Sequence, residues 1–435
     1  MSNLDELFTF LKYESISSDP NCQSEINECA QFLVKTLQGI GIQKTQLIDT
    51  PGHPVVLAHH HQSDDYPTVL FYGHYDVQPA SPLAAWASPP FEPTIRDGYL
   101  FARGAADDKG QVWCHIEAIK RLILNQTPHC NIILLIEGEE EVGSPHLLPV
   151  LTRYIPQLKP DICLISDTPM LSADQPSICT SLRGICYIEL TVTGAKMDLH
   201  SGQMGGPAPN PINALAFIIS QLNDPLGHVL VPGFYNDAQC ITASSAIPFS
   251  DSEFRQTLGI DSTWGSPVES LPTKLWYRPT LDCHGIWGGF TDEGTKTVIP
   301  STASAKLSMR LIPNQSPNAI FNCVKSYIQS ITPPGVTVSI THHHGANPVS
   351  MDTEHAAFSV AKDAIQFAFG KPPLFTGEGG SIPIVSQLKD SLQCDTILMG
   401  FNLPNDNIHG PNERFKLDHY EKGILAASYF YSSLI

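Results

Sequence analysis

Five possible metal ligands, all imidazoles or carboxylates, each follow closely after a predicted strand of this sequence. They are His74 in FYGHYDV, Asp107 in GAADDKG, Glu141 in EGEEEVGS, Asp167 in LISDTP and His409 in NIHGPNE. Mixed imidazole and carboxylate ligands suit zinc, and also manganese or cobalt. Five ligands are more than one tetrahedral zinc uses. They suit two metals that share one carboxylate, an arrangement that activates water for hydrolysis.

The residues around these ligands allow further roles, although each also has a purely structural interpretation. In an extended chain Asp76 points to the same side as His74, so it could orient the imidazole or simply cap a turn. Asp107 could bridge two metals, or it could serve with Asp108 at the start of the next helix. Of the three consecutive glutamates at 139–141, one could bind metal and a neighbour could act as general base. Such a run is otherwise a solvated turn.

Length, composition and charge restrict the class of protein. A chain of 435 residues is long for one hydrophobic core, so two domains are expected, and a hydrophobic content of 42% indicates a globular protein. The net charge of −18 argues against nucleic acid or an anionic membrane as partner. Eleven cysteines without a CxxC pair favour reduced thiols and a cytoplasmic protein. We find no signal peptide and no apolar run approaching about 18 residues.

Predicted strands and helices alternate in the first part of the chain and return near its end. Helices are predicted at 3–12, 23–39, 110–125, 145–158 and 417–433, and buried strands at 68–72, 131–136, 162–165 and 396–399. This alternation indicates an α/β fold with a mostly parallel sheet flanked by helices. Because ligands bind beyond the carboxyl ends of such strands, we expect all five candidate ligands at that edge.

Residues 184–348 follow a different pattern. Strands are predicted there at 185–193, 303–312 and 336–341, and helices at 213–222 and 317–331. This order resembles a ferredoxin-like α+β domain inserted into the first domain, which would comprise residues 1–183 and 349–435. The segment 224–289 is rich in proline and glycine and receives no assignment.

Longer motifs strengthen this interpretation. They are FYGHYDVQPA, ARGAADDKG, EGEEEVGS, SLRGICYIE, KMDLHSG, TKTVIPSTASAKLSMRLIPN and GEGGSIP. Together they resemble the co-catalytic zinc aminopeptidase-fold hydrolases. This family includes carnosinase, the cytosolic nonspecific dipeptidases, succinyl-diaminopimelate desuccinylase, acetylornithine deacetylase and aminoacylase. The motifs extend from about residue 68 to residue 414, and LRGICY, DLHSG and KTVIP are most similar to the carnosinase-like dipeptidases.

The resemblance implies two divalent metal ions per subunit, zinc in the first place, with manganese or cobalt as alternatives. The proposed ligands are His74 and Asp167 for one metal, Glu141 and His409 for the other, and Asp107 as the bridge between them. The peptide bond between Asp107 and Asp108 is expected to be cis. Asp76 would orient the first histidine, and Glu140 would be the general base that deprotonates the shared water and then protonates the leaving amine.

The resemblance also implies how the substrate is recognised. The inserted domain would be a lid and dimerisation domain, from which His200 reaches the partner's site and stabilises the tetrahedral oxyanion. Arg310 would bind the substrate's C-terminal carboxylate. The other substrate-binding residues would be His344, Gly379, Gly380, Ser381 and, contributed across the dimer, Thr297. Gly377 departs from the family, in which an arginine often precedes Glu-Gly-Gly-Ser.

The sequence therefore predicts a homodimeric, zinc-dependent metallopeptidase that cleaves the amide bond of dipeptides or short peptides. An N-acyl- or N-carbamoyl-amino-acid amidohydrolase is the alternative, because the same metal centre serves these reactions. A peptide-binding paralogue without catalysis is a further alternative. It is disfavoured because the five ligands, Asp76, Glu140 and His200 are all present.

Overall fold

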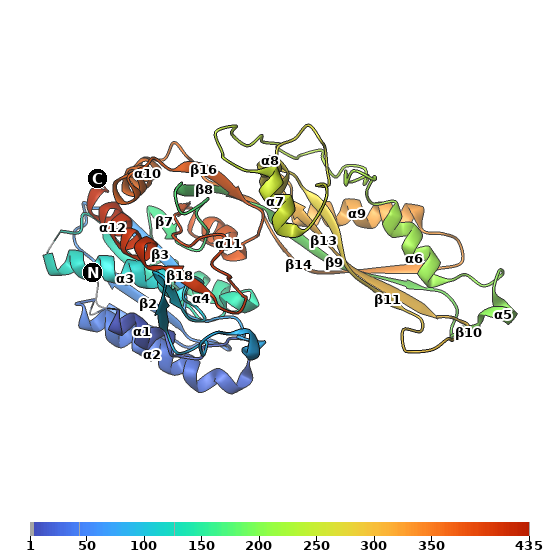
Figure 1. Cartoon of the computed structure of the whole chain (residues 1–435), viewed down its shortest axis with the longest axis horizontal. Coiled ribbons are helices and arrows are strands. Elements are labelled where there is room, and N and C mark those ends of the chain that lie inside the picture. The colour runs from blue at the N-terminus through green and yellow to red at the C-terminus, as the bar shows by residue number, and fades with distance from the viewer. Residues whose placement is uncertain (1–3, 43, 126, 435) are drawn as a thin grey trace. The chain divides into compact units, whose positions relative to one another are not determined.

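The computed structural model describes residues 4–42, 44–125 and 127–434, and its chain divides into two compact units (Figure 1). The first unit runs to Thr180 and includes Met351–Thr376 and the residues from Ile384 onward. The second unit comprises Ser181–Ser350 and Gly377–Pro383. A short segment from late in the chain therefore completes the second unit.

The large sheet contains nine strands among the described residues, in the order β1-β2-β6-β3-β7-β17-β8-β15, with β16 beside β8. Their bounds are β1 Lys44–Ile48, β2 Val55–His60, β3 Thr68–His74, β6 Asn131–Glu137, β7 Ile162–Ile165, β8 Ser177–Leu182, β15 Val349–Ser350, β16 Leu374–Glu378 and β17 Asp395–Leu398. The central strands β6, β3, β7 and β17 are parallel, whereas β2 pairs antiparallel with β6 and with β1, and β8 pairs antiparallel with β17 and with β15. The predicted parallel sheet is confirmed at its centre, where runs such as NIILLI are buried throughout.

Helices pack on this sheet and enclose the hydrophobic core of the first unit. They are α1 Asp5–Leu11, α2 Gln23–Gly39, α3 Lys109–Asn125, α4 Leu147–Tyr154, α10 Ala356–Phe369, α11 Pro383–Leu392 and α12 Leu417–Ser433. The apolar stripes of α2 and α12 predict both helices with the bounds that the structure has. The buried Trp113 of α3 stacks on Phe32 of α2 and packs against Phe10 of α1, which joins the three helices.

A small three-stranded sheet accompanies the large one in the first unit. It consists of β4 Thr94–Arg96, β5 Tyr99–Phe101 and β18 Arg414–Lys416. Its strand β5 pairs with β18, which leads directly into α12. The loop before α3 therefore lies beside a segment from the end of the chain, and this neighbourhood shapes the site described below.

The second unit has the predicted ferredoxin-like arrangement. Its four-stranded antiparallel sheet has the order β11 (Thr280–Gly288), β13 (Thr302–Leu311), β9 (Gly184–Thr193) and β14 (Thr337–Ala346). Helices α6 (Pro211–Ser220) and α9 (Pro317–Ile331) pack on β9, with α6 also on β13 and α9 also on β14. The alternating burial of β9 explains the packing, because every second residue enters the core between the sheet and the helices.

Short elements lie at the two ends of this unit. At one end β10 (Leu199–His200) pairs with β12 (Val298–Ile299) and leads into α5 (Ser201–Met204) (Figure 1). At the other end are α7 (Asp251–Leu258) and α8 (Leu271–Tyr277), within the segment that received no assignment. The Ser250 hydroxyl caps the start of α7, and Gly259 ends the helix in the left-handed conformation. Residues typical of helix ends therefore mark both ends of α7 in the sequence.

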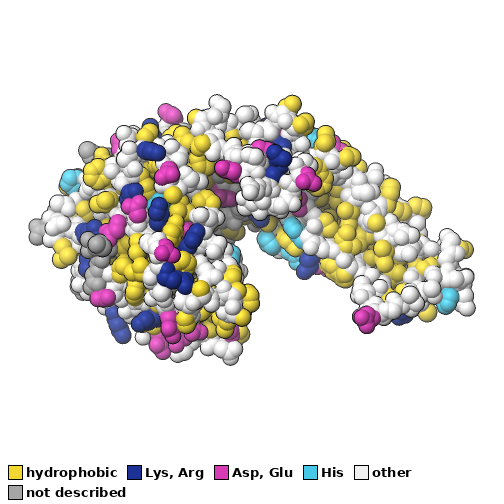
Figure 2. Space-filling model, viewed as in Figure 1, with side chains coloured by type: hydrophobic (Ala, Val, Ile, Leu, Met, Phe, Trp, Pro, Cys, Tyr) yellow, Lys and Arg dark blue, Asp and Glu magenta, His cyan; other side chains and the backbone are white. Residues whose placement is uncertain are grey.

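The surface is of mixed character. On the face shown in Figure 2, acidic and basic side chains are interspersed, and hydrophobic side chains show at many places on the second unit. Exposed hydrophobic residues of that unit include Phe217 of α6 and Ile286 and Trp287 of β11. In the described part of the chain, every helix is too short or too polar to cross a bilayer.

Candidate metal centre

Four of the five candidate ligands follow strands of the parallel centre. His74 is the last residue of β3, and Asp167 stands two residues after β7. Glu141 lies in the short 3-10 helix Glu140–Val142 after β6, and His409 lies in the loop after β17. Because these strands are neighbours and run in the same direction, their carboxyl ends place these side chains at one edge of the sheet.

Asp107 does not follow a strand of this sheet, so the expectation that all five ligands do so is wrong. It immediately precedes α3, and the nearest strand before it, β5, belongs to the small antiparallel sheet. The peptide bond from Asp107 to Asp108 is cis, as the resemblance implied. The backbone carbonyl of Asp108 accepts the hydrogen bond of Val112, so Asp108 opens the helix while Asp107 stays outside it.

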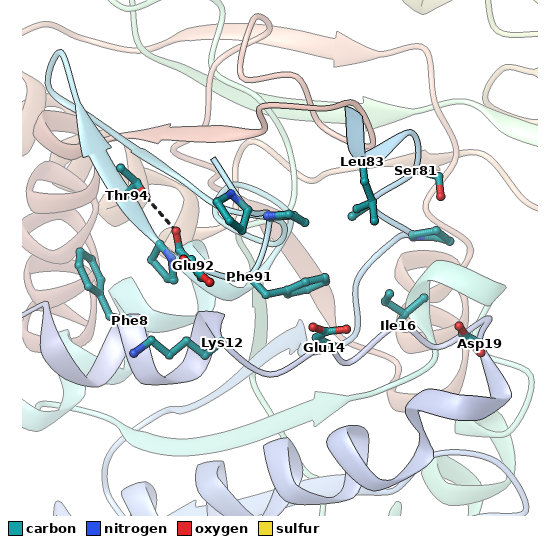
Figure 3. Close-up of a pocket in the computed structure, with 15 residues that line it drawn as sticks. Phe8, Lys12, Glu14, Ile16, Asp19, Ser81, Leu83, Phe91, Glu92 and Thr94 are labelled. Carbon is teal, nitrogen blue, oxygen red and sulfur yellow. Dashed lines mark hydrogen bonds between the residues drawn. The ribbon is translucent and has the colours of Figure 1, made fainter. Parts of the chain in front are cut away.

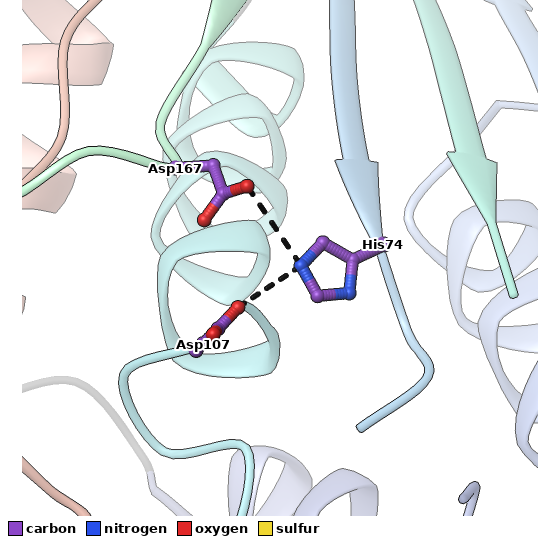
Figure 4. A group of neighbouring side chains, drawn as sticks. All are labelled: His74, Asp107 and Asp167. Atoms are coloured by element: carbon purple, nitrogen blue, oxygen red, sulfur yellow. Dashed lines mark hydrogen bonds and ion pairs between the residues drawn. The ribbon is translucent and has the colours of Figure 1, made fainter. Parts of the chain in front are cut away.

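The first group of ligands gathers around His74 (Figure 4). Its Nε2 atom lies 3.1 Å from Asp107 Oδ1 and 3.9 Å from Asp167 Oδ2. Figure 4 shows both carboxylates facing this same nitrogen. Ligand atoms of the three residues all lie within 4.8 Å of one another, a separation at which a single ion of zinc size can contact all of them.

The second group uses the other oxygen of Asp107. Asp107 Oδ2 lies 2.9 Å from His409 Nε2, which in turn lies 3.2 Å from Glu141 Oε2. The carboxylate of Asp107 thus faces one group with each oxygen, as a bridging ligand would. Glu141 Oε1 is buried and has no hydrogen-bond partner among the described residues. An unpaired buried carboxylate oxygen among other carboxylates fits the presence of cations, so the donor set suits two divalent metals.

The ionisation of these groups reflects crowding of like charges. Burial, followed by the charge of Asp107, raises the pKa of Asp167 well above its usual value. Burial also raises the pKa of Glu140 to about 7, although His74 acts in the opposite direction. Burial lowers the pKa of His74, but hydrogen bonds with Asp107 and Asp76 more than offset this and raise it. Carboxylates this close together are expensive to ionise unless positive charge compensates them.

Asp76 connects the first histidine to the glutamate turn. It is completely buried, and its carboxylate accepts hydrogen bonds from the backbone N–H groups of Glu140 at 3.2 Å and Glu141 at 3.1 Å. His74 Nδ1 lies 3.4 Å from Asp76 Oδ1 and 3.1 Å from the backbone carbonyl oxygen of Asp76. Oδ1 and the backbone carbonyl oxygen of Asp76 therefore both lie near Nδ1 of the imidazole, and the carboxylate also holds the turn that carries the proposed base.

Comparison with known proteins decides the family. The model of the peptidase family M20/M25/M40 matches residues 70–432. The chain belongs to this family. Its relatives include the Cys-Gly metallodipeptidase dug1 of Schizosaccharomyces pombe, which is 33% identical over 94% of this chain and 90% of its own length. The human Beta-Ala-His dipeptidase is 31% identical over 97% of this chain and 87% of its own length.

Solved structures agree with this assignment. The M20 family metallo-carboxypeptidase Sso-CP2 from Sulfolobus solfataricus superimposes with a TM-score of 0.89 and 32% identity over 99% of both chains. Human carnosine dipeptidase 1 gives a TM-score of 0.84 and 29% identity over 99% of this chain and 95% of that structure. The predicted family, the α/β fold and the assignment as a peptidase are thereby confirmed.

The residues expected to bind the substrate carboxylate form a chain of contacts within the second unit of this M20 peptidase. Arg310 Nη1 donates a hydrogen bond to Ser381 Oγ at 2.9 Å, and Ser381 Oγ donates to the carbonyl of Arg183 at 2.5 Å. Arg183 Nε in turn donates to the carbonyl of Gly379 at 2.9 Å. The segment Gly377–Pro383, which also contains Gly380, is thus fastened to Arg310 of β13 and to Arg183, which lies between β8 and β9.

The remaining predicted residues divide between the two ends of the same sheet. His344 pairs with Tyr187, on whose ring it stacks at 5.2 Å, and Arg310 pairs with Ile185 nearby. His200 lies at the opposite end, where it pairs with Val298 in the small β10-β12 ladder. Thr297 precedes β12, and its carbonyl accepts a hydrogen bond from Ser201. Arg310 and His344 therefore lie on the two strands that flank β9, toward the same end of the sheet, and His200 and Thr297 form a second, exposed pair.

Packing explains the glycine that departs from the family pattern. A Cβ atom at Gly377 would lie 2.7 Å from Cβ of Trp276, 2.9 Å from Oγ of Ser181 and 3.0 Å from the ring of Tyr277. Helix α8 contributes Trp276 and Tyr277 and occupies the space that a side chain would need. An arginine at this position is therefore incompatible with the observed packing.

Two residues that hold the candidate metal ligands, Glu413 and Gln78, were not predicted from the sequence. The completely buried carboxylate of Glu413 accepts hydrogen bonds from Arg103 and from the backbone of the loop that ends at Asp107. Gln78 Nε2 donates to Glu141 Oε2 at 2.8 Å. The first stands in the motif NIHGPNE, which could have directed attention to it, whereas the isolated glutamine carries no signal in the sequence.

A cavity of about 970 Å³ in the first unit lies apart from these ligands. It is lined by residues of α1, the segment that follows it, and the loops around Pro79 and Pro90 (Figure 3). Figure 3 shows the apolar side chains of Phe8, Leu83 and Phe91 along it, together with Lys12. No candidate metal ligand is among the lining residues that the structure describes, so size alone does not mark this cavity as the active site.

Proposed function

We propose that this M20 peptidase is a di-metal dipeptidase that hydrolyses the amide bond of dipeptides or related short peptides. The observation that carries the proposal is the carboxylate of Asp107, which faces a separate group of ligands with each oxygen. Glu140 stands beside this centre, on the same short turn as Glu141. Relatives named as Cys-Gly and Beta-Ala-His dipeptidases align over nearly the whole chain and support a dipeptide as substrate.

The five ligands His74, Asp107, Glu141, Asp167 and His409 would hold two zinc ions, with manganese or cobalt as alternatives. Such a pair, when bound, supplies a lowered pKa for water and polarises the substrate carbonyl. Glu140 would remove a proton from the attacking water and later deliver it to the leaving amine.

Asp76 would have two positioning tasks. Its contact with His74 Nδ1 directs Nε2 of the same ring toward Asp107 and Asp167. Its two hydrogen bonds with the backbone at Glu140 and Glu141 fix the turn that carries the base. Complete burial prevents water from competing for these hydrogen bonds, which favours a rigid arrangement.

Arg310 would recognise the C-terminal carboxylate of the substrate. A guanidinium presents paired donors that match a carboxylate, and it stays charged at neutral pH although burial lowers its pKa. The hydroxyl of Ser381 holds one arm of the fork and is itself anchored on Arg183. His344, Gly379 and Gly380 would complete this part of the pocket, where glycines permit a close approach of the substrate backbone.

His200 would act on a substrate bound by a partner subunit, together with Thr297. It is separated from Arg310 by the length of β13, which at about 3.4 Å per residue amounts to roughly 25 Å. An extended dipeptide spans at most about 7 Å, so one molecule cannot contact both residues of a single chain. His200 is exposed, and its ring accepts a hydrogen bond from Gly202, close by in its own chain. A second copy is the natural source of the missing contact.

A homodimer formed through the second unit would supply that copy. Strand β11 is an edge of the four-stranded sheet and exposes Ile286 and Trp287, with Phe217 of α6 exposed in the same unit. Edge strands with exposed apolar side chains are common sites of association. We also propose that the protein is cytoplasmic, because none of the eleven cysteines, all of which are described, forms a disulfide bond.

The deciding experiment uses protein stripped of metal and reloaded with zinc or manganese. Hydrolysis is measured on a panel of dipeptides beside N-acyl- and N-carbamoyl-amino acids. We expect metal-dependent cleavage of dipeptides. Turnover restricted to acyl or carbamoyl compounds would keep the metal chemistry and replace the substrate. The absence of any turnover with two metals bound would contradict an enzymatic function.

A further inference from the structure

A buried glutamate, Glu413, holds the loop that presents Asp107. Its Oε1 accepts hydrogen bonds from the backbone N–H groups of Ala106 at 2.9 Å and Asp107 at 3.1 Å. Its Oε2 accepts from Arg103 Nη1 at 2.6 Å and from the backbone of Gly104 at 3.0 Å. Glu413 is 0% exposed, so these four donors replace the hydrogen bonds that water would make to its carboxylate.

The backbone N–H of Asp107 is therefore anchored directly on a residue distant in sequence. The same peptide group is held from its other side as well, because the carbonyl of Ala106 accepts a hydrogen bond from Gln111 Nε2 at 3.0 Å. A carboxylate that bridges two metals must keep both oxygens in fixed directions, and a freely moving loop cannot achieve this. The clamp by Glu413 and Gln111 removes that freedom.

Arg103 balances the charge of Glu413 and extends the clamp. The two form an ion pair in which each side chain is 1% exposed. Arg103 Nη2 also donates to the carbonyl of Pro79, and its backbone N–H donates to the carbonyl of Pro90. The pair thereby joins the loop before α3 to the segment that follows His74 in the sequence and to the segment that contains His409.

We propose that Glu413 is a positioning residue of the metal centre, which fixes the direction of the Asp107 carboxylate and thereby sets the affinity for both metals. The inference rests on the proposed di-metal site. Because Asp107 is shared, a loosened loop should weaken both metal positions together. Loss of a residue that orients a metal ligand typically weakens metal binding by about 10- to 100-fold.

The test is Glu413→Gln in the full chain, with Glu269→Gln as the matched control. The substitution keeps the shape of the side chain but turns one acceptor oxygen into a donor facing other donors. Glu269 is likewise paired with an arginine, Arg278, at 2.7 Å, and lies in the second unit. Zinc affinity and stoichiometry are measured by competition with a chromophoric chelator, without substrate. We expect both dissociation constants to rise by about 10-fold or more in Glu413→Gln and to stay unchanged in the control.

Kinetics provide a second readout that a purely structural role would not produce. We expect kcat of Glu413→Gln to fall with little change in KM, and excess zinc to restore part of kcat. Glu413→Asp keeps the charge, so its zinc affinity and kcat should lie between those of the unchanged protein and Glu413→Gln. This variant serves as the test if Glu413→Gln does not fold. Two zinc ions bound as tightly as in the unchanged protein, with only a lower melting temperature, would overturn the inference. Failure of the unchanged, zinc-loaded protein to cleave dipeptides would instead contradict the proposed function.

Discussion

His74 and Asp76 at the candidate metal centre and His200 of the second unit are held in contrasting ways. His74 and Asp76 of the first unit are 0% exposed and make hydrogen bonds to residues from several segments. In the second unit His200 is exposed and contacts a close neighbour in sequence. His74 and Asp76 have their contacts within one chain, whereas the ring of His200 is free to contact a substrate bound by another molecule. The contrast indicates that chemistry and recognition can be disrupted separately.

The largest effect should come from the proposed base. Glu140→Gln removes the group that accepts the proton, so kcat should fall by about 10²- to 10⁴-fold. Metal content should stay near normal, since Glu140 belongs to neither group of ligands. Steady-state rates and elemental analysis of the purified variant measure both quantities. Glu139→Gln is the control, because Glu139 bonds His146 instead. Full activity of Glu140→Gln would contradict the mechanism.

A slightly smaller loss of kcat is expected for His200→Ala. Mixing this variant with a second variant should restore activity if His200 acts across the dimer. Loss of an oxyanion donor should lower kcat by about 10²- to 10³-fold. Mixed with Glu140→Ala, the variant should form hybrid dimers in which one site has both groups. Random mixing would then restore about a quarter of the wild-type sites. Activity of the mixture compared with each variant alone measures this. A mixture as inactive as its components would argue against action across a dimer.

Arg310 should affect binding more than chemistry. Arg310→Ala removes a fork that pairs with the substrate carboxylate, so KM should rise by about 10- to 100-fold, with a smaller change in kcat. A dipeptide amide, which lacks the carboxylate, should be a poor substrate for the unchanged protein and should lose little further with the variant. Arg255→Ala on the exposed face of α7 is the control. Equal losses on both substrates would show that Arg310 does not contact the carboxylate.

The smallest effect concerns the pH dependence of stability in the first unit. His115 of α3 is buried against Phe71 at 4.0 Å, and burial lowers its pKa to about 3. The pKa of histidine in an unfolded chain is about 6.5. Below that pH the imidazole of His115 is therefore protonated in the unfolded chain but stays neutral in the folded chain. At pH 5.5 this should cost about 1.4 kcal/mol, or a tenfold change in the unfolding equilibrium.

Hydrogen exchange of peptides from each unit, measured at pH 7.5 and 5.5, separates this effect from changes in the second unit. We expect the acid-dependent loss of protection to be concentrated in the first unit and to diminish in His115→Gln. Glutamine retains a donor near the position of Nε2, which lies 2.7 Å from Ser166 Oγ, but cannot titrate. An unchanged pH dependence in the variant would assign the effect to another group.

Local patterns predicted the regular elements and most ligands, because these depend on nearby residues. Helix α9 begins and ends where its apolar stripe predicts, and Asp167 follows a buried strand as expected. Asp107 does not follow a strand of the large sheet as expected, and its backbone N–H donates instead to Glu413, which is distant in the chain. Strand β11 was not predicted, since a bulge between Cys283 and Gly285 interrupts its alternation and most of its residues are exposed. Pairwise contacts across the fold, such as that of Arg310 with Ser381, have no counterpart in local sequence patterns.

The position of β17 between β7 and β8 has a consequence for how the enzyme is made. Residues 183–350 are translated after β7 and β8 but before β17, so the large sheet has an open place while the second unit can already fold. Until β17 arrives, the neighbouring strand edges are unpaired and prone to wrong pairing in the cell. His409 and Glu413 emerge from the ribosome later still. A nascent chain therefore carries four of the five ligands without an assembled centre, and hydrolysis begins only after the last strands have been translated.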